Sequence, residues 1–188
     1  MDENPTTIDS IQWEILRIIF LFLPKWYRPL VAFTCRKWRS ILLKLPRNEL
    51  NCDDIASVGW INVLKWAREH GCPWDEWTCL YAAEGGHLEV LQWLREHGCP
   101  WNEVTCMEAA RGGHLEVLQW AREHGCSWHS DVCVLAALDG NLEMLQWARA
   151  QPWPCPWDYR VCRVATIGGH TEILRWAKEN GCDDFESY

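Results

Sequence analysis

The chain has 188 residues, a formal net charge of −8, 15 tryptophans and 11 cysteines. The acidic balance argues against nucleic acid or an anionic membrane as a partner, and the 48% hydrophobic content is enough for a folded core. The longest apolar run, residues 15–23, is too short to span a bilayer, and the acidic start does not resemble a signal peptide. The odd cysteine count excludes complete internal pairing. We therefore expect a protein of the cytoplasm or nucleus, in a reducing compartment, with free thiols.

Charge divides the chain near Pro46. Residues 1–50 hold eight Lys and Arg against five Asp and Glu, whereas residues 51–188 hold 10 against 21. Because Pro46 cannot continue a helix, we place a boundary there. The sequence predicts a domain over residues 1–46, a second over residues 51–182 and a tail over residues 183–188.

The first domain has a helical pattern. Asp9 and Gln12 can form a capping box for a helix that ends before Pro24. Pro29 suits the first turn of a second helical stretch that ends before Pro46. About three short helices bury only a small core, so the apolar side chains of this domain must dock on something.

Residues 13–24 and 30–39 resemble an F-box. The first stretch is similar to the first helix of that family, and the second ends in its basic-basic-Trp signature at Arg36, Lys37 and Trp38. Ile11-Gln12 stands where the family usually has Leu-Pro. The resemblance implies a three-helix domain that binds a Skp-type adaptor, and the alternative is a helical cap that closes the following domain. Residues implied either to contact the adaptor or to form the F-box core are Trp13, Ile15, Ile18, Leu23, Pro24, Leu30 and Trp38.

The second domain is a repeat. The motif at residues 70–74, His-Gly-Cys-Pro-Trp, recurs after 27 residues and, with Ser for Pro, after another 27. Further copies follow at spacings of 29 and 27 residues. Most of the Trp and Cys excess therefore comes from one copied unit. We expect an N-terminal cap at 51–71, mainly one helix, and repeats at 72–98, 99–125, 126–154 and 155–181.

Each unit is predicted to be a pair of helices. Asp75, Asn102 and Asp158 can cap the first helix, and His129 is a weaker cap in the third copy. A Gly-Gly break such as Gly85-Gly86 separates the two helices. A pair of this size cannot bury its apolar stripe alone, so the units should stack into an all-α solenoid.

The unit resembles the ankyrin repeat. Residues 82–91 are similar to the helix–turn–helix centre of that family, and residues 98–102 lie where the family has Gly-Ala-Asp-Val-Asn. The unit here has mostly 27 residues rather than 33, and the missing residues correspond to the tip of the β-hairpin in ankyrin repeats. The resemblance covers about residues 51–182 and implies a helical-pair solenoid that binds protein.

Positions that are constant between copies are predicted to be scaffold. We expect the tryptophan series of Trp93 to pack between units, and an aromatic ladder for ligand stacking is the alternative. The repeated cysteines are interpreted as small buried hydrophobic residues, and a metal-binding solenoid is the alternative. His87, His114 and His170 should hydrogen-bond at the turn. The sequence indicates no catalytic residue, no metal and no cofactor.

Positions that vary between copies lie on one face of the first helix, at i, i+4 and i+7. Variation on a copied scaffold is typical of a protein-binding surface. The predicted target-binding residues are Trp77, Tyr81 and Glu84, then Val104, Glu108 and Arg111, then Asp131, Leu135 and Leu138, then Arg160, Val164 and Ile167.

An F-box followed by target-binding repeats resembles the substrate adaptor of a Skp–cullin–F-box ubiquitin ligase, which is not itself an enzyme. The acidic repeats favour a target with a basic patch. The alternative is an ankyrin-type scaffold that recruits no ligase. The combination also resembles proteins encoded by large DNA viruses of amoebae, and in that case the target is a host protein in the host cell.

Overall fold

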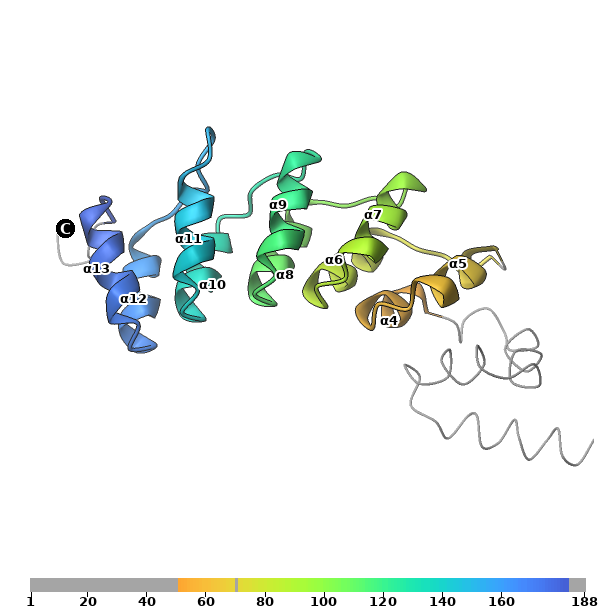
Figure 1. Ribbon diagram of the computed structural model, residues 1–188, viewed down its shortest axis with the longest axis horizontal. Coiled ribbons are helices and arrows are strands. Elements are labelled where there is room, and N and C mark those ends of the chain that lie inside the picture. The colour runs from red at the N-terminus through yellow and green to blue at the C-terminus, as the bar shows by residue number, and fades with distance from the viewer. Residues whose placement is uncertain (1–50, 70, 183–188) are drawn as a thin grey trace, which may run out of the picture.

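The computed structural model of the chain describes residues 51–69 and 71–182, which form ten α-helices and no strand. The helices alternate between a first helix (A) and a second helix (B), and the pairs follow one another in chain order along the long axis (Figure 1). The A helices are α4 (Cys52–Ser57), α6 (Glu76–Glu84), α8 (Glu103–Arg111), α10 (Val132–Leu138) and α12 (Tyr159–Ile167). The B helices are α5 (Ile61–Glu69), α7 (Leu88–Glu96), α9 (Leu115–Glu123), α11 (Leu142–Arg149) and α13 (Thr171–Glu179).

The expected caps start three of the A helices. The Asp75 carboxylate accepts a hydrogen bond from the Trp77 amide at 2.9 Å, and Asn102 and Asp158 act in the same way on α8 and α12. In the third copy Asp131 makes no side-chain cap, and its own amide donates to His129 Nδ1. Helix α10 accordingly has seven residues where α6, α8 and α12 have nine.

The histidines at the A-to-B turns join neighbouring pairs. His114 Nε2 donates to the carbonyl of Glu84, which is the last residue of the preceding A helix, at 3.0 Å. His87 and His170 make the same bond to the carbonyls of Ser57 and Leu138. The predicted role at the turn is therefore confirmed, and the partner of each histidine lies in the preceding repeat.

The stack is tighter along the A helices than along the B helices, because α4, α6, α8, α10 and α12 contact their neighbours more extensively than the B helices do. Its core consists mainly of small side chains, with Cys79, Ala82 and Ala83 as the buried face of α6. The Trp93 series packs against this core but is only partly buried. The tryptophans are therefore scaffold, as predicted, but they cover the core instead of filling it.

The two ends of the described stack differ from its middle. Residues 51–71 were expected to supply mainly one helix, but they contain the short α4 as well as α5. At the other end, Arg163 and Thr166 are exposed at the positions where α6 has the buried Leu80 and Ala83. Polar residues at these positions are typical of a pair at the edge of a stack, and α12 and α13 are the last pair of the described residues.

The predicted first domain, residues 1–46, and its candidate adaptor-binding residues lie outside the described residues, as does the predicted tail. Within the described ranges, no helix is long and apolar enough to cross a membrane.

Candidate target-binding face

The twelve predicted target-binding residues lie on the A helices or, for Asp131, at the cap of one. They lie on the side opposite the buried alanines and cysteines, as the three-position pattern predicted. We call this surface the A face. Because adjacent A helices pack directly together, the A face continues from α6 to α12.

Exposure on the A face is highest at Trp77 and at the last position of the pattern in each repeat. Trp77 is 51% exposed at the start of α6, and Leu138 and Ile167 are 43% and 72% exposed at the ends of α10 and α12. The middle positions Tyr81 and Leu135 are partly buried. Large apolar side chains at such exposure are typical of protein-contact surfaces.

Glu108 departs from the expected pattern. It was predicted as an accessible residue of the A face but is only 8% exposed. Burial raises the pKa of its carboxyl group, and the guanidinium of Arg111, at 3.1 Å, opposes this shift. Glu108 therefore offers little surface for contact with a target, whereas its ion-pair partner Arg111 remains exposed.

Charges at the C-terminal half of the A face are paired. Arg160 bridges two repeats, because Nη1 donates to Asp131 Oδ1 at 2.7 Å and Nε donates to Asp158 Oδ2 at 3.0 Å. Because these charges are paired, the exposed aliphatic side chains Leu138 and Ile167 are the main surface available for contact in that half. The N-terminal half combines the aromatic Trp77 with the exposed carboxylate of Glu84.

The B helices carry a repeated clamp that holds consecutive pairs together. The guanidinium of Arg95 lies 4.3 Å from the ring centre of Trp101 and donates to the carbonyl of Cys99. The same arrangement recurs at Arg68, Arg122 and Arg149. These cations are therefore part of the scaffold and not a free basic surface.

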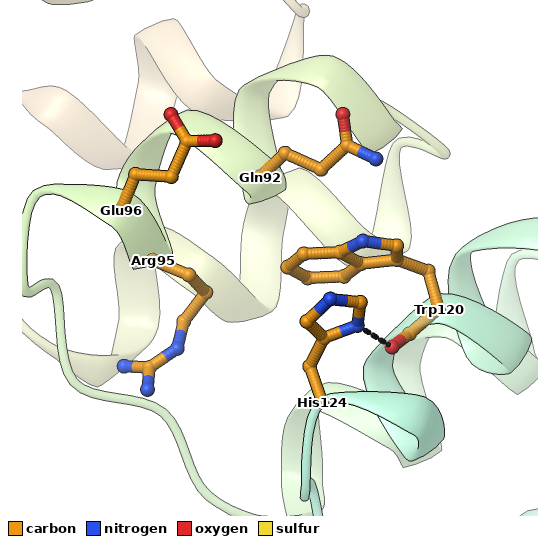
Figure 2. Close-up of a pocket in the computed structure, with 5 residues that line it drawn as sticks. All are labelled: Gln92, Arg95, Glu96, Trp120 and His124. Carbon is orange, nitrogen blue, oxygen red and sulfur yellow. Dashed lines mark hydrogen bonds between the residues drawn. The ribbon is translucent and has the colours of Figure 1, made fainter.

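A hollow of about 490 Å³ lies between α7 and α9, away from the A face (Figure 2). The Trp120 ring stacks on His124 with 4.1 Å between ring centres, and His124 Nδ1 donates to the Trp120 carbonyl. Arg95 lines the hollow but is held by the clamp described above. None of the predicted target-binding residues lines it, and its walls are largely repeated scaffold groups.

Sequence reasoning missed the pairing of the cysteines. Cys79 on α6 makes a hydrogen bond with Cys99, which follows α7, and Cys106 does the same with Cys126. The members of each of these pairs are 20 residues apart, and that constant separation was the signal available in the sequence. In the described ranges, no group of three or more His, Cys, Asp or Glu side chains is placed to hold a metal ion.

Comparison with known domain families identifies two parts of the chain. Residues 8–50 match the F-box domain, and residues 79–122 match ankyrin repeats (many copies). The chain thus matches the F-box over one stretch and ankyrin repeats over a second, separate stretch. No curated protein matches the chain, so the resemblance to proteins of amoebal viruses stays a prediction.

Both domains are interaction modules, and no enzymatic family is indicated. The F-box implies a Skp-type adaptor as a partner, and the ankyrin repeats imply a target protein. This combination fits a substrate-adaptor or protein-binding role.

Proposed function

We propose that the chain is the substrate-recognition adaptor of a Skp–cullin–F-box ubiquitin ligase. The observation that carries the proposal is the order of its parts. An F-box match at residues 8–50 precedes ankyrin-type repeats whose A face exposes Trp77, Leu138 and Ile167.

The F-box end would recruit the ligase. Its contacts to the Skp-type adaptor are assigned to Trp13, Ile15, Ile18, Leu23, Pro24, Leu30 and Trp38. A cullin would then join through the adaptor and not through this chain. The place of action is the cytoplasm or nucleus, of a host cell if the chain is viral.

The A face would hold the target. Its exposed apolar side chains provide buried contact area, and the acidic excess of residues 51–188 favours a target with a basic patch. The chain contributes binding and positioning only. A target held beside a ubiquitin-carrying enzyme gains effective concentration, and this proximity accelerates transfer.

A second candidate function is an ankyrin-type scaffold that binds one partner without recruiting a ligase. The observation that favours it is Ile11-Gln12, which replaces the Leu-Pro usual at the start of an F-box.

Adaptor binding separates the two functions. The purified full chain should bind a purified Skp-type adaptor with micromolar or tighter affinity in a titration, and Trp38→Ala and Ile15→Ala should weaken that binding at least about tenfold, or about 1.4 kcal/mol.

The matched control is Leu138→Ser on the A face, which should leave adaptor binding unchanged. Circular dichroism of each variant establishes that the repeats remain folded. A folded full chain that does not bind the adaptor would establish the scaffold function instead.

A further inference from the structure

The repeats contain a set of cysteine pairs that the proposed function does not use. Ten of the 11 cysteines lie in the described residues, and all ten are buried free thiols. Each pair consists of one cysteine near the start or middle of an A helix and one just after the following B helix, 20 or 22 residues later. The pairs are Cys52–Cys72, Cys79–Cys99, Cys106–Cys126, Cys133–Cys155 and Cys162–Cys182.

In the first four pairs the two thiols are in hydrogen-bond contact. Cys79 makes this bond to Cys99, and the Cys99 thiol donates to the carbonyl of Asp75 at 3.2 Å. Cys106 and Cys126 repeat the arrangement, with the Asn102 carbonyl as the final acceptor at 3.2 Å. Each of these pairs therefore connects the segment after a B helix to the N-cap residue of the A helix that precedes it.

The last pair follows the same plan. Cys162 Sγ donates to the carbonyl of Cys182 at 3.6 Å, and Cys182 Sγ donates to the carbonyl of Asp158 at 3.4 Å. A disulfide has a sulfur–sulfur length of about 2.05 Å, so thiols already in contact need only a small approach to form one.

The members of the Cys106–Cys126 pair differ in acidity. The hydrogen bond from Cys106 lowers the pKa of Cys126, burial opposes this shift, and the nearby Arg122 guanidinium acts in the same direction as the hydrogen bond. The hydrogen bond to Cys126 and burial raise the pKa of Cys106. Cys126 is therefore the better nucleophile of this pair, because the thiolate is the reactive form.

We propose that the five pairs are reversible oxidation sites, at which hydrogen peroxide closes one disulfide between the two cysteines of each pair. One thiol of the pair ionises, its thiolate attacks one peroxide oxygen, the O–O bond breaks, and a sulfenic acid forms; the hydroxide that leaves takes up the proton released by the thiol and becomes water. The second thiol then attacks the sulfenic sulfur, an S–S bond forms, and the sulfenic hydroxyl leaves with the proton of the second thiol as another water. Two thiols are oxidised, one peroxide is reduced, and two waters are produced.

The consequence is a covalent crosslink in each helix pair. The bond joins the A helix to the segment after the B helix and closes a loop of about 20 residues, which restricts the unfolded chain. Oxidised repeats should therefore unfold at a higher temperature than reduced ones.

Burial sets the order of reaction, since each pair must open locally to admit peroxide. Among the described residues, the α12–α13 pair has a stacked neighbour on one side, and Cys182 is 5% exposed whereas Cys106 is fully buried. End repeats open more readily than central ones. Cys162–Cys182 should therefore form first and Cys106–Cys126 late.

The test uses the full-length native chain, treated with hydrogen peroxide, quenched in acid, unfolded and alkylated. The number of alkylated cysteines should fall from 11 to one, because five disulfides consume the ten described cysteines. Peptide mapping should show the five pairs above, with Cys162–Cys182 first, and dithiothreitol should restore all thiols.

A matched variant, Cys79→Ser, should leave Cys99 alkylatable while the other four pairs still form. The proposal is overturned if peroxide leaves the native thiols unchanged, if cysteines of different pairs are joined, or if sulfinic and sulfonic acids form in place of disulfides. If the variant unfolds, the alkylation count and peptide map of the wild-type chain still test the proposal.

Discussion

Gly112 has an ordinary helical backbone, and yet its turn has no space for a larger residue. A Cβ atom there would lie 2.4 Å from the carbonyl oxygen of Glu84 and 2.5 Å from the ring of His114. This is the point where His114 reaches across to hydrogen-bond that same carbonyl. Close approach between repeats, and not backbone freedom, therefore requires glycine at this position.

Gly113 has the opposite requirement, because its φ is +76° and nothing lies within 4 Å of a Cβ atom. We expect Gly112→Ala to destabilise the repeats by about 2–3 kcal/mol, since backbone atoms must shift. Gly113→Ala should cost about 1 kcal/mol from its left-handed backbone alone. Chemical denaturation measures the loss of unfolding free energy in each variant. An equal loss in both, or a larger loss in Gly113→Ala, would contradict the role given to Gly112.

Glu108 makes stability depend on pH. Because burial raises its pKa in the folded protein, the folded state binds more protons than the unfolded state between the two pKa values. Stability due to this group is therefore highest below the unfolded pKa and falls as pH rises through the folded pKa. Glu108→Gln should stabilise the protein at pH 7 by less than about 1 kcal/mol, and the gain should vanish in acid.

Urea titrations at pH 7 and at a pH below the ordinary glutamate pKa measure this difference. Glu116→Gln, which changes an exposed carboxylate on α9, is the control and should alter stability little at either pH. A loss of stability in Glu108→Gln at pH 7 would mean that the ion pair with Arg111 outweighs the burial of the carboxylate.

At the scale of the helix, the tryptophans on the B helices stabilise the stack from its outside. Trp93 on α7 is partly buried, and its ring centre lies 5.6 Å from that of Trp74 in an edge-to-face contact. Trp93→Ala should cost about 2–3 kcal/mol, at or below the lower end for a buried aromatic residue. Trp153, which is 80% exposed after α11, is the matched control, and Trp153→Ala should change stability by less than about 0.5 kcal/mol.

Thermal unfolding of the two tryptophan variants tests the scaffold assignment. A large loss in Trp153→Ala together with no loss in Trp93→Ala would reverse it.

Helix boundaries were predictable because their signals are local. Asp75, Asn102 and Asp158 act on amides two residues away, and Gly86 sets its own turn. The cysteine pairing was not inferred, because it depends on how an A helix meets a segment 20 residues further along. The depth of Glu108 likewise depends on the packing of adjacent helices, which periodicity does not report.

At the scale of the molecule, the proposed function gives one chain two binding regions, the F-box match and the A face. The A face is continuous because the A helices pack closely, and α12 carries the exposed Arg163 and Thr166 where α6 has buried residues. The A face was predictable from variation between copies, the exposure of its side chains required the structure, and target binding by these residues stays a prediction. The central claim is that the same molecule joins a target to a Skp-type adaptor.

A two-step affinity purification from cells tests this claim most directly. Complexes are captured first through the Skp-type adaptor and then through the full chain, and quantitative mass spectrometry identifies the proteins that remain bound. The comparison is between the wild type and the A-face double variant Leu138→Ser, Ile167→Ser, with Glu89→Gln on the exposed side of α7 as the control. We predict that the double variant retains the adaptor but loses at least one protein that the wild type and Glu89→Gln both retain. Recovery of the same proteins with all three chains would contradict target binding by the A face, and absence of the adaptor from all three would contradict ligase recruitment.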